Sequence, residues 1–155
     1  MRITDQYFWN IVFSLFFVFL VAMGTLILDS AAYKTYAELA LGDFVLMTLA
    51  SWRLVRLFVY DKIMACVREQ FWDAKVTKTS VTLTKPQGGP RRTIADLFSC
   101  PWCFGVWGTA CVVFFYLLTP YAFFPVLILA LSAVATFLQI LTNMIEKMGS
   151  ATISK

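Results

Sequence analysis

The chain of 155 residues is 60% hydrophobic and 17% aromatic, and only 14% of its residues are charged. A soluble domain has about 45–50% apolar and about 25% charged residues, so this composition excludes an ordinary soluble protein. The sequence has no histidine and no glycine-rich phosphate loop, which argues against a His-assisted hydrolase and a nucleotide enzyme. We therefore expect an all-α membrane protein with a single membrane domain, residues 1–155, and we assign no catalytic residue.

Four apolar stretches are long enough to cross the hydrocarbon of a bilayer, which takes about 17–25 helical residues. They cover residues 8–28, 36–52, 103–118 and 123–142. The first exceeds the about 7–15 residues of a signal-peptide h-region, so we interpret it as a retained helix. Because only residues 119–122 separate the last two stretches, we expect these two helices to form an antiparallel hairpin.

Two acidic residues, Glu38 and Asp43, lie near the start of the second stretch and have different implications. Thr35 and Glu38 have the spacing of a capping box, which predicts that the helix begins there. Asp43 would then lie about two turns into this helix. An ionisable residue inside a membrane helix is a functional candidate, although water at the outer end would also account for it.

Basic residues orient the chain, because nine of its thirteen Lys and Arg residues lie in the segment of residues 53–99. The positive-inside rule places this segment in the cytoplasm, and four spans would then place both termini there. Topology accounts for these charges, so no nucleic acid partner is expected.

The segment of residues 53–99 has three different patterns. Apolar residues at Ile63, Val67 and Phe71 recur with helical spacing, which predicts an amphipathic helix in the membrane interface over residues 52–72. Residues 75–84 favour a short exposed strand or loop, and residues 85–90 favour a turn. Thr93 and Asp96 then indicate the start of another helix.

The motif Cys100-Pro101-Trp102-Cys103 precedes the third stretch. If Cys100 caps this helix, Pro101 occupies the first helical position, where its missing N–H costs nothing. The Cys100 sulfur would then face free backbone N–H groups, and we expect Arg91 and Arg92 nearby, all of which favour the thiolate.

Three interpretations of this cysteine pair remain open. It could be a structural helix start, a reactive dithiol, or part of a metal site completed by Cys66 or by a second subunit. A single C-x-x-C motif without histidine is only a moderate signal, so we expect no cofactor. Zinc would need Cys66, a carboxylate or a second subunit as a further ligand. Reducing conditions in the cytosol argue against a permanent disulfide.

Arg53, Arg56 and Tyr60 share one face of a helix, and Asp61 follows directly. Such a face can bind the phosphate of an anionic lipid, or its arginines can pair internally with Asp61 or Glu146. The candidate residues for binding a lipid, an anion or a partner are therefore Arg53, Arg56, Tyr60, Asp61, Arg91 and Arg92.

Polar residues follow one face of the last stretch at helical spacing. Helix packing through hydrogen-bonding side chains explains such a stripe more often than a permeation path does. The stripe comprises Ser132, Thr136, Gln139, Asn143 and Glu146.

The Arg-x-x-Arg and Tyr-Asp motifs within residues 49–63, Arg68, and the Cys-Pro-Trp-Cys motif followed by Gly105 and Trp107 form a combination. This combination resembles a family of small bacterial membrane proteins known only as a domain of unknown function, with spore-former and phage members. The resemblance covers about residues 38–145 and leaves out the first stretch. It implies a bacterial cytoplasmic membrane and no particular activity.

The resemblance also implies that residues of these motifs act together: Arg53, Arg56, Asp61, Cys100 and Cys103. We expect Cys100 and Cys103 to face Arg53, Arg56 and Asp61 across the cytoplasmic end of the bundle. Three functions are compatible with the sequence. We favour a structural component of a membrane assembly that binds lipid and either a protein partner or further copies of itself. The others are a thiol oxidoreductase or a redox or metal sensor, and a transporter or channel subunit that uses Asp43 and the polar stripe.

Overall fold

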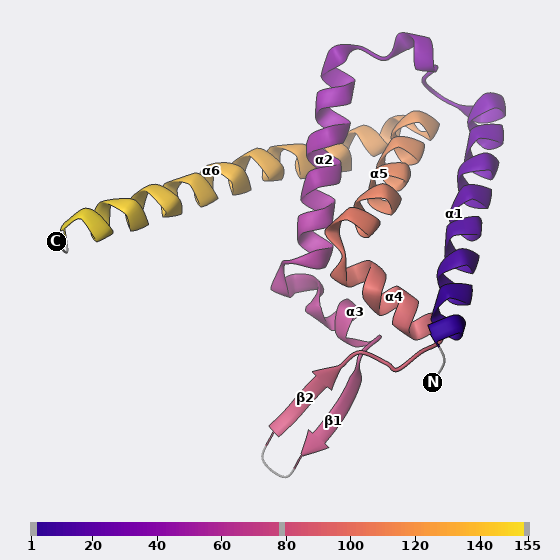
Figure 1. Ribbon diagram of the computed structural model, residues 1–155. Coiled ribbons are helices and arrows are strands. Elements are labelled where there is room, and N and C mark those ends of the chain that lie inside the picture. Colours follow the sequence, from indigo (N-terminus) through magenta and orange to yellow (C-terminus); the bar gives the residue numbers. More distant parts are fainter. Residues whose placement is uncertain (1–2, 78–79, 154–155) are drawn as a thin grey trace.

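Helices dominate the structure, a computed structural model that describes residues 3–77 and 80–153. The described residues also include one antiparallel two-stranded sheet. In chain order the elements are α1 (Ile3–Ala31), η1 (Tyr36–Glu38), α2 (Leu41–Val59), η2 (Lys62–Met64), α3 (Ala65–Glu69), β1 (Asp73–Thr77), β2 (Ser80–Thr84), α4 (Pro90–Ser99), α5 (Pro101–Leu118), η3 (Pro120–Ala122) and α6 (Phe123–Ile153) (Figure 1).

Three helical segments of the described chain are long and apolar enough to cross a membrane: Gln6–Ala31, Pro101–Leu118 and Pro120–Gly149. These segments match three of the four predicted spans and indicate a membrane protein. The remaining predicted span, residues 36–52, falls largely in α2, a helix that carries three ionisable residues and does not belong to this group.

The core lies where α2 and α5 meet the first half of α6. Leu117 is 1% exposed and Ala50 is not exposed at all. Around them pack Met47, Val112, Tyr116, Val126 and Ala130. Small residues at Ala50, Ala130 and Ala133 allow the backbones of α2 and α6 to approach closely.

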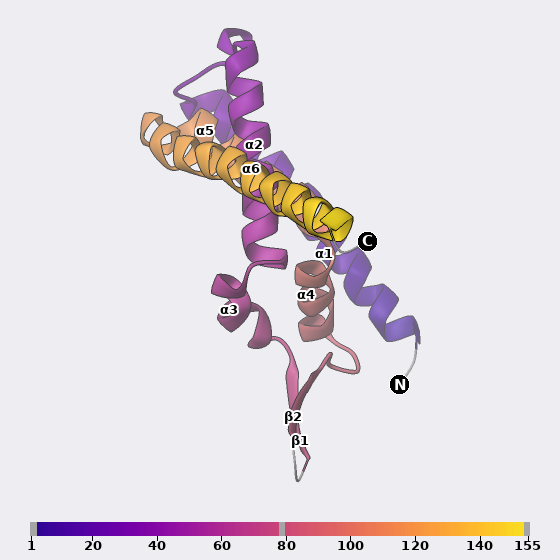
Figure 2. The ribbon, with the colours of Figure 1, turned by 90° about the vertical axis from the view of Figure 1, so that its left-hand side faces the viewer.

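The direction of α6 differs from the sequence prediction. Figures 1 and 2 show α6 crossing α2 at a steep angle and leaving the bundle, instead of returning beside α5. The predicted antiparallel hairpin of the last two stretches is therefore wrong. The physical reason is that α6 packs mainly against α2, where Ser132 accepts a hydrogen bond from Arg53 Nε at 2.9 Å.

Helix α2 begins later than predicted. Glu38 accepts a hydrogen bond from the Thr35 backbone N–H at 3.3 Å, but this contact closes only the short helix η1. The α-helix starts at Leu41, and Asp43 accepts a hydrogen bond from the Ala40 backbone N–H at 2.9 Å. Asp43 therefore lies in the first turn, where a carboxylate is favoured by the helix dipole, and not two turns inside the helix.

The predicted interfacial helix over residues 52–72 is not continuous. Its first part extends α2 to Val59. The helix is then interrupted before the short helices η2 and α3. Arg68 of α3 holds this break, because its Nη1 donates to the Phe58 carbonyl at 3.2 Å and to the Val59 carbonyl at 2.6 Å. These carbonyls belong to the last turn of α2, whose orphan acceptors need such donors.

The segment predicted to be extended forms a β-hairpin, in which β1 and β2 pair from Asp73 and Thr84 to Thr77 and Ser80. Residues 78–79 lie outside the described residues. The following helix α4 starts at Pro90, after Gly89 with a φ of 85°, so the predicted start at Thr93 is three residues late. Thr93 instead is buried and accepts a hydrogen bond from Gln6 Nε2 of α1 at 3.0 Å.

Candidate functional site

The cysteine motif forms a sharp junction between α4 and α5. Cys100 is the N-cap of α5, and its Sγ accepts a hydrogen bond from the Cys103 backbone N–H at 3.3 Å. Pro101 occupies the first helical position, as the sequence predicts. Cys100 is also the C-cap of α4, and its own N–H donates to the Leu97 carbonyl at 3.3 Å. The sulfur therefore lies between the negative end of one helix dipole and the positive end of another.

Hydrogen bonding lowers the pKa of the Cys100 thiol below its usual value. The largest cause is the Cys103 side chain, followed by the Cys103 backbone N–H, and the charge of Lys85 adds a smaller effect. Partial burial acts in the opposite direction. The geometry thus favours a thiolate at Cys100, with Cys103 as its neighbouring donor.

The expected role of Arg91 and Arg92 beside this thiol is not what the structure shows. Both lie in the first turn of α4, at the opposite end from Cys100. Arg91 pairs with Asp73 at 3.4 Å, and Arg92 with Asp96 at 3.7 Å. The basic residue that acts on Cys100 is Lys85. Sequence reasoning missed it because it begins the predicted turn and has no helical spacing to the motif.

The described residues contain no group of three or more His, Cys, Asp or Glu side chains that could hold a metal ion. Cys66, the proposed third ligand, donates instead to the Ile63 carbonyl at 3.7 Å within its own segment. All four cysteines have free thiols. One copy of the described chain therefore brings only Cys100 and Cys103 together.

A second group of polar residues joins the end of α2 to α6. Arg53 Nη1 lies 3.0 Å from Asp61 Oδ2, and Arg53 Nε donates to Ser132 Oγ. In a continuous helix two residues eight positions apart would be separated by about 12 Å along the axis. The helix α2 ends before Asp61, so this separation does not apply. Asp61 has an extended backbone conformation, and its side chain reaches back to Arg53.

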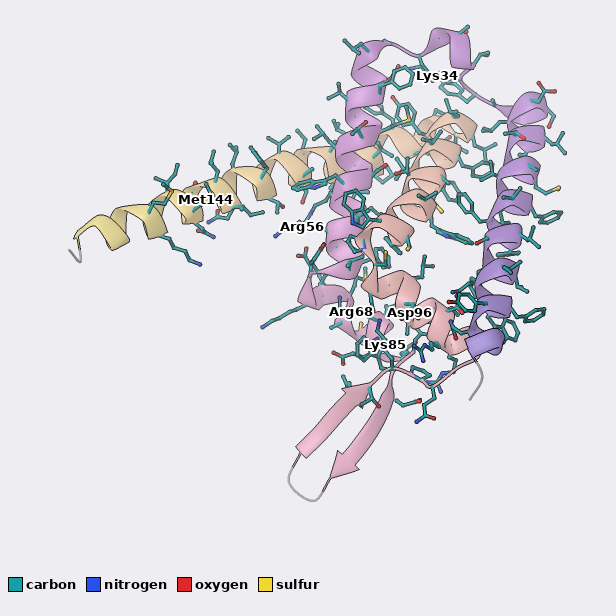
Figure 3. All side chains as sticks on the ribbon, in the orientation of Figure 1. Lys34, Arg56, Arg68, Lys85, Asp96 and Met144 are labelled. Atoms are coloured by element: carbon teal, nitrogen blue, oxygen red, sulfur yellow. The ribbon has the colours of Figure 1, made fainter. Side chains whose placement is uncertain are left out.

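The other members of the predicted arginine face have different surroundings. Arg56 Nε is buried and has no hydrogen-bond partner among the described residues. Tyr60, the C-cap of α2, is 60% exposed. Arg53 is thus an internal residue of the bundle, Arg56 is half-buried, and Tyr60 is the exposed member of the face. Figure 3 shows Arg56 and Arg68 at the same end of the bundle as Lys85 and Asp96.

Four phenylalanine rings connect the elements at this end of the bundle. Their centroids lie 5.2 Å apart for Phe58 and Phe104, 5.4 Å for Phe98 and Phe104, and 5.8 Å for Phe71 and Phe98. The rings come from α2, from the turn after α3, from α4 and from α5. Sequence reasoning missed this cluster, since its members are far apart in the chain and have no common spacing.

The expected joint site of the cysteines and the arginine face is not formed by direct contact. Within the described part of the chain, no hydrogen bond or ion pair connects Cys100 or Cys103 with Arg53, Arg56 or Asp61. Arg53 instead binds residues on the side of α6. The cysteine pair and the arginine face therefore have different binding partners within the chain.

Asp43 belongs to a third polar group at the opposite end of α2. Its carboxylate lies 2.7 Å from Lys34 Nζ and accepts a hydrogen bond from the Tyr116 hydroxyl. Figure 3 shows Lys34 at the end of the bundle remote from Arg56 and Arg68. Sequence reasoning found Asp43 but not Lys34 or Tyr116. The pairing gives this intramembrane candidate a structural explanation, because it neutralises the charge and satisfies the carboxylate oxygens.

The polar stripe of α6 has two parts. Ser132 and Thr136 are partly buried against the bundle, and Thr136 Oγ1 donates to the Ser132 carbonyl at 2.7 Å. Gln139, Asn143 and Glu146 are exposed on the part of α6 that leaves the bundle, and Gln139 donates to Asn143 at 3.4 Å. In Figure 3 the label of Met144 marks this outer part.

Three apolar helical segments around a buried α2–α5–α6 core define a small α-helical membrane protein. The chain belongs to a family of proteins of unknown function, DUF1360, whose sequence profile matches residues 46–142. The match confirms the resemblance to a bacterial family without an assigned activity. It includes α2 from Leu46 onward, the cysteine motif and the first part of α6, and it leaves out α1, Asp43, Asn143 and Glu146.

Two relatives come from Bacillus subtilis strain 168. The chain is 35% identical to the sporulation protein YjcA over 105 residues, which are 64% of this chain and 89% of the relative. It is 30% identical to the UPF0713 protein YngL over 97 residues, which are 62% of this chain and 75% of the relative. No solved structure matches the chain.

Proposed function

We propose that this protein is a multi-pass component of a bacterial membrane assembly and that its helix α6 binds a protein partner or a second copy of the chain. The observation that carries this proposal is the outer part of α6. It exposes large apolar side chains, among them Phe137, Leu141 and Met144, next to the polar residues Gln139 and Asn143. Gln139 and Asn143 bond each other through one pair of atoms, but lipid tails offer no partners to the other polar atoms of the two amides.

The inner part of the same stripe supports this interpretation. Ser132 already serves helix packing, because it binds Arg53 of α2. The stripe continues along the same face beyond the bundle, so a second helix packed there would extend an existing mode of contact. The name of the relative YjcA, a sporulation protein, fits a role in a membrane assembly of spore-forming bacteria.

The face formed by Arg56 and Tyr60 supports a further contact with anionic lipid. A half-buried guanidinium next to an exposed phenol suits a phosphate group. We place this face, the β-hairpin and both termini in the cytoplasm of a cell bounded by the bacterial cytoplasmic membrane, because the basic residues are concentrated between α2 and α5. In this topology α2 also crosses the membrane, as the second of four spans in chain order, with Asp43 paired at its outer end.

Photocrosslinking in native membranes tests the partner. Benzoylphenylalanine at Met144 is expected to give a discrete crosslinked protein band, which Asn143→Leu weakens because it removes the polar contact. The matched control is the same probe at Val18, which is 63% exposed on α1. Lipid adducts alone at both positions would contradict the proposal.

Cysteine labelling tests the topology. In a variant without the four native cysteines, a membrane-impermeant maleimide should label Lys34→Cys in intact cells and Gln87→Cys only after permeabilisation. The opposite pattern would show that the orientation is inverted.

Thiol chemistry is a second candidate function, which the environment of Cys100 favours. A Cys100 thiolate would attack a disulfide of a substrate and form a mixed disulfide, and Cys103 would resolve it. The substrate would leave as a dithiol, and the protein would retain a Cys100–Cys103 disulfide. Differential alkylation should then find an oxidised fraction that rises under oxidative stress, whereas constantly free thiols would exclude this function.

A further inference from the structure

A long apolar cleft lies between α1, α2 and α5. Its volume is about 1300 Å³, which exceeds the about 300–1,000 Å³ of a site for a drug-sized ligand. Its walls are residues 17–28 of α1, residues 44–55 of α2 and residues 101–117 of α5. Figure 1 shows α5 between α1 and α2.

The lining is mostly apolar, and its polar groups are a few hydroxyls, three indole N–H groups and the Cys111 thiol. It contains no Asp, Glu, Lys or Arg. The hydroxyls of Thr25, Thr48 and Ser51 each donate to a carbonyl of their own helix at 2.7 Å. A ligand with polar atoms would lose its hydrogen bonds to water on entering, whereas a hydrocarbon chain would lose none. The charge and polarity of the cleft are therefore complementary to hydrocarbon.

The dimensions and the position of the cleft also suit an acyl chain. From Phe44 to Val55 the wall formed by α2 is about 16 Å long, close to half of the about 30 Å of a bilayer's hydrocarbon. The lining is continuous with the lipid-facing surface of two candidate spans, because Val21 of α1 and Val106 of α5 line the cleft and are 42% and 56% exposed.

The contacts of α1 leave this side of the helix open. Gln6 binds Thr93 of α4, and Phe17 packs against Trp107 of α5 with ring centroids 4.8 Å apart. After the end of α1, the Tyr33 N–H donates to the Leu117 carbonyl at 3.0 Å. These contacts join α1 to α4 and α5, and the cleft separates it from α2.

We propose that this cleft binds acyl chains of a membrane phospholipid, which fill the space between α1 and α2 and hold α1 against the bundle. The proposal goes beyond the binding of a partner by α6 and depends only on the insertion of the chain in a membrane. A helix of a second copy is the competing occupant.

Native mass spectrometry tests the proposal on the full chain, purified in a mild detergent. The wild-type protein is expected to retain adducts with the mass of a phospholipid, and palmitoyl-oleoyl phosphatidylglycerol should restore them after delipidation. Val106→Trp and Val21→Trp place an indole in the cleft from two different walls, and each should cause a several-fold loss of the adducts. Leu131→Trp is the matched control, since Leu131 of α6 is 62% exposed and does not line the cleft.

Each other outcome would overturn the proposal. Wild-type protein without phospholipid adducts, adducts with the mass of a free fatty acid alone, or equal loss in Leu131→Trp and Val106→Trp would exclude a phospholipid site in this cleft. A dimer in the wild type that Val106→Trp converts to a monomer would assign the cleft to a second copy. Val106→Leu is a control, because it keeps an aliphatic side chain at this position. Helical content measured by circular dichroism shows whether a variant that loses the adducts is still folded. None of these results depends on crosslinking through α6.

Discussion

Single side chains hold the elements of this bundle in their relative positions. Arg53 connects the middle of α2 with the segment after its break, through Asp61, and with α6, through Ser132. The side chain of Arg53 is only 17% exposed and that of Asp61 30%, so each partner would be left partly desolvated if the other were removed. Such groups contribute more by avoiding an unpaired charge than by mutual attraction.

We expect Arg53→Ala to lower the free energy of unfolding by about 1–2 kcal/mol, because it leaves Asp61 and Ser132 without their donor. Unfolding in mixed micelles by increasing concentrations of SDS measures this loss. The matched control is Arg56→Ala, one turn along the same helix, whose Nε has no partner in the described chain. Equal losses in both variants would show that the Arg53 contacts do not stabilise the bundle.

The lowered pKa of Cys100 predicts a pH dependence with a definite sign. The wild-type thiol should react with iodoacetamide at a lower pH than an ordinary cysteine, because more thiolate is present. Cys103→Ala removes the side chain that is the largest cause of this shift and should move the midpoint of the reaction to higher pH. Measurements in a background of Cys66→Ser and Cys111→Ser isolate the site, and an unchanged midpoint would contradict the expected role of Cys103.

The same shift has a consequence for stability. Because the pKa of Cys100 is lower in the folded chain than in the unfolded chain, deprotonation favours the folded chain. This contribution is present above the unfolded pKa and is lost as the pH falls through the folded pKa.

At the scale of elements, the sequence predicts what depends on neighbouring residues. The cap at Cys100, the proline that follows it and the extended segment before residue 85 are local features, and the structure contains all three. The start of α2 differs from the prediction because two acidic residues have the capping spacing, and each binds its own backbone N–H group. Glu38 binds that of Thr35 and Asp43 that of Ala40, and only the second begins the α-helix.

Other features depend on contacts between distant residues, which spacing alone does not reveal. The break of α2 is held by Arg68, nine residues beyond the carbonyl of Val59. The direction of α6 follows from its packing on α2 and from the bond between Ser132 and Arg53. A short connection limits the distance between two helices but not the angle at which the second one leaves.

We expect Arg68→Ala to destabilise the fold by about 1–2 kcal/mol, because two carbonyls at the end of α2 lose a charged donor. The same unfolding assay measures the change. Arg91→Ala is a suitable control, since the Arg91 side chain is 56% exposed and its ion pair is on the surface. A loss for Arg91→Ala as large as that for Arg68→Ala would count against the proposed cap.

Gly108 determines how closely α2 and α5 pack. A Cβ atom at this position would lie 3.0 Å from Leu54 Cδ2, so Leu54 would have to move. We expect Gly108→Ala to cost about 1–3 kcal/mol of stability. Gly42→Ala is the control, because a Cβ atom there would meet nothing within 4 Å. If the two variants unfold at the same concentration of SDS, the close approach at Gly108 has no energetic importance.

At the scale of the whole molecule, the family match and the packing divide the chain in the same way. The match ends at residue 142, within the part of α6 that leaves the bundle, and it begins after α1. The buried core formed by α2, α5 and the first half of α6 lies within the matched residues, apart from Leu28 of α1. The matched part therefore contains the main source of stability, and the ends of the chain add further surfaces.

A chain that ends at Thr142 tests this division. We expect its thermal unfolding temperature in detergent to stay close to that of the full chain, because residues 143–149 are exposed. Crosslinking from a probe at Leu141 should decrease at the same time, because the truncation removes the rest of the proposed binding helix. A marked fall in the unfolding temperature would show that the end of α6 stabilises the bundle itself.

The cluster of Phe58, Phe71, Phe98 and Phe104 has a consequence for how this end of the bundle responds to change. The four rings come from α2, from the turn after α3, from α4 and from α5, and they pack in one connected group. Because packed aromatic side chains transmit a displacement to their neighbours, a change at one ring reaches all four segments. The junction that carries the cysteine motif is thus mechanically connected to the end of α2.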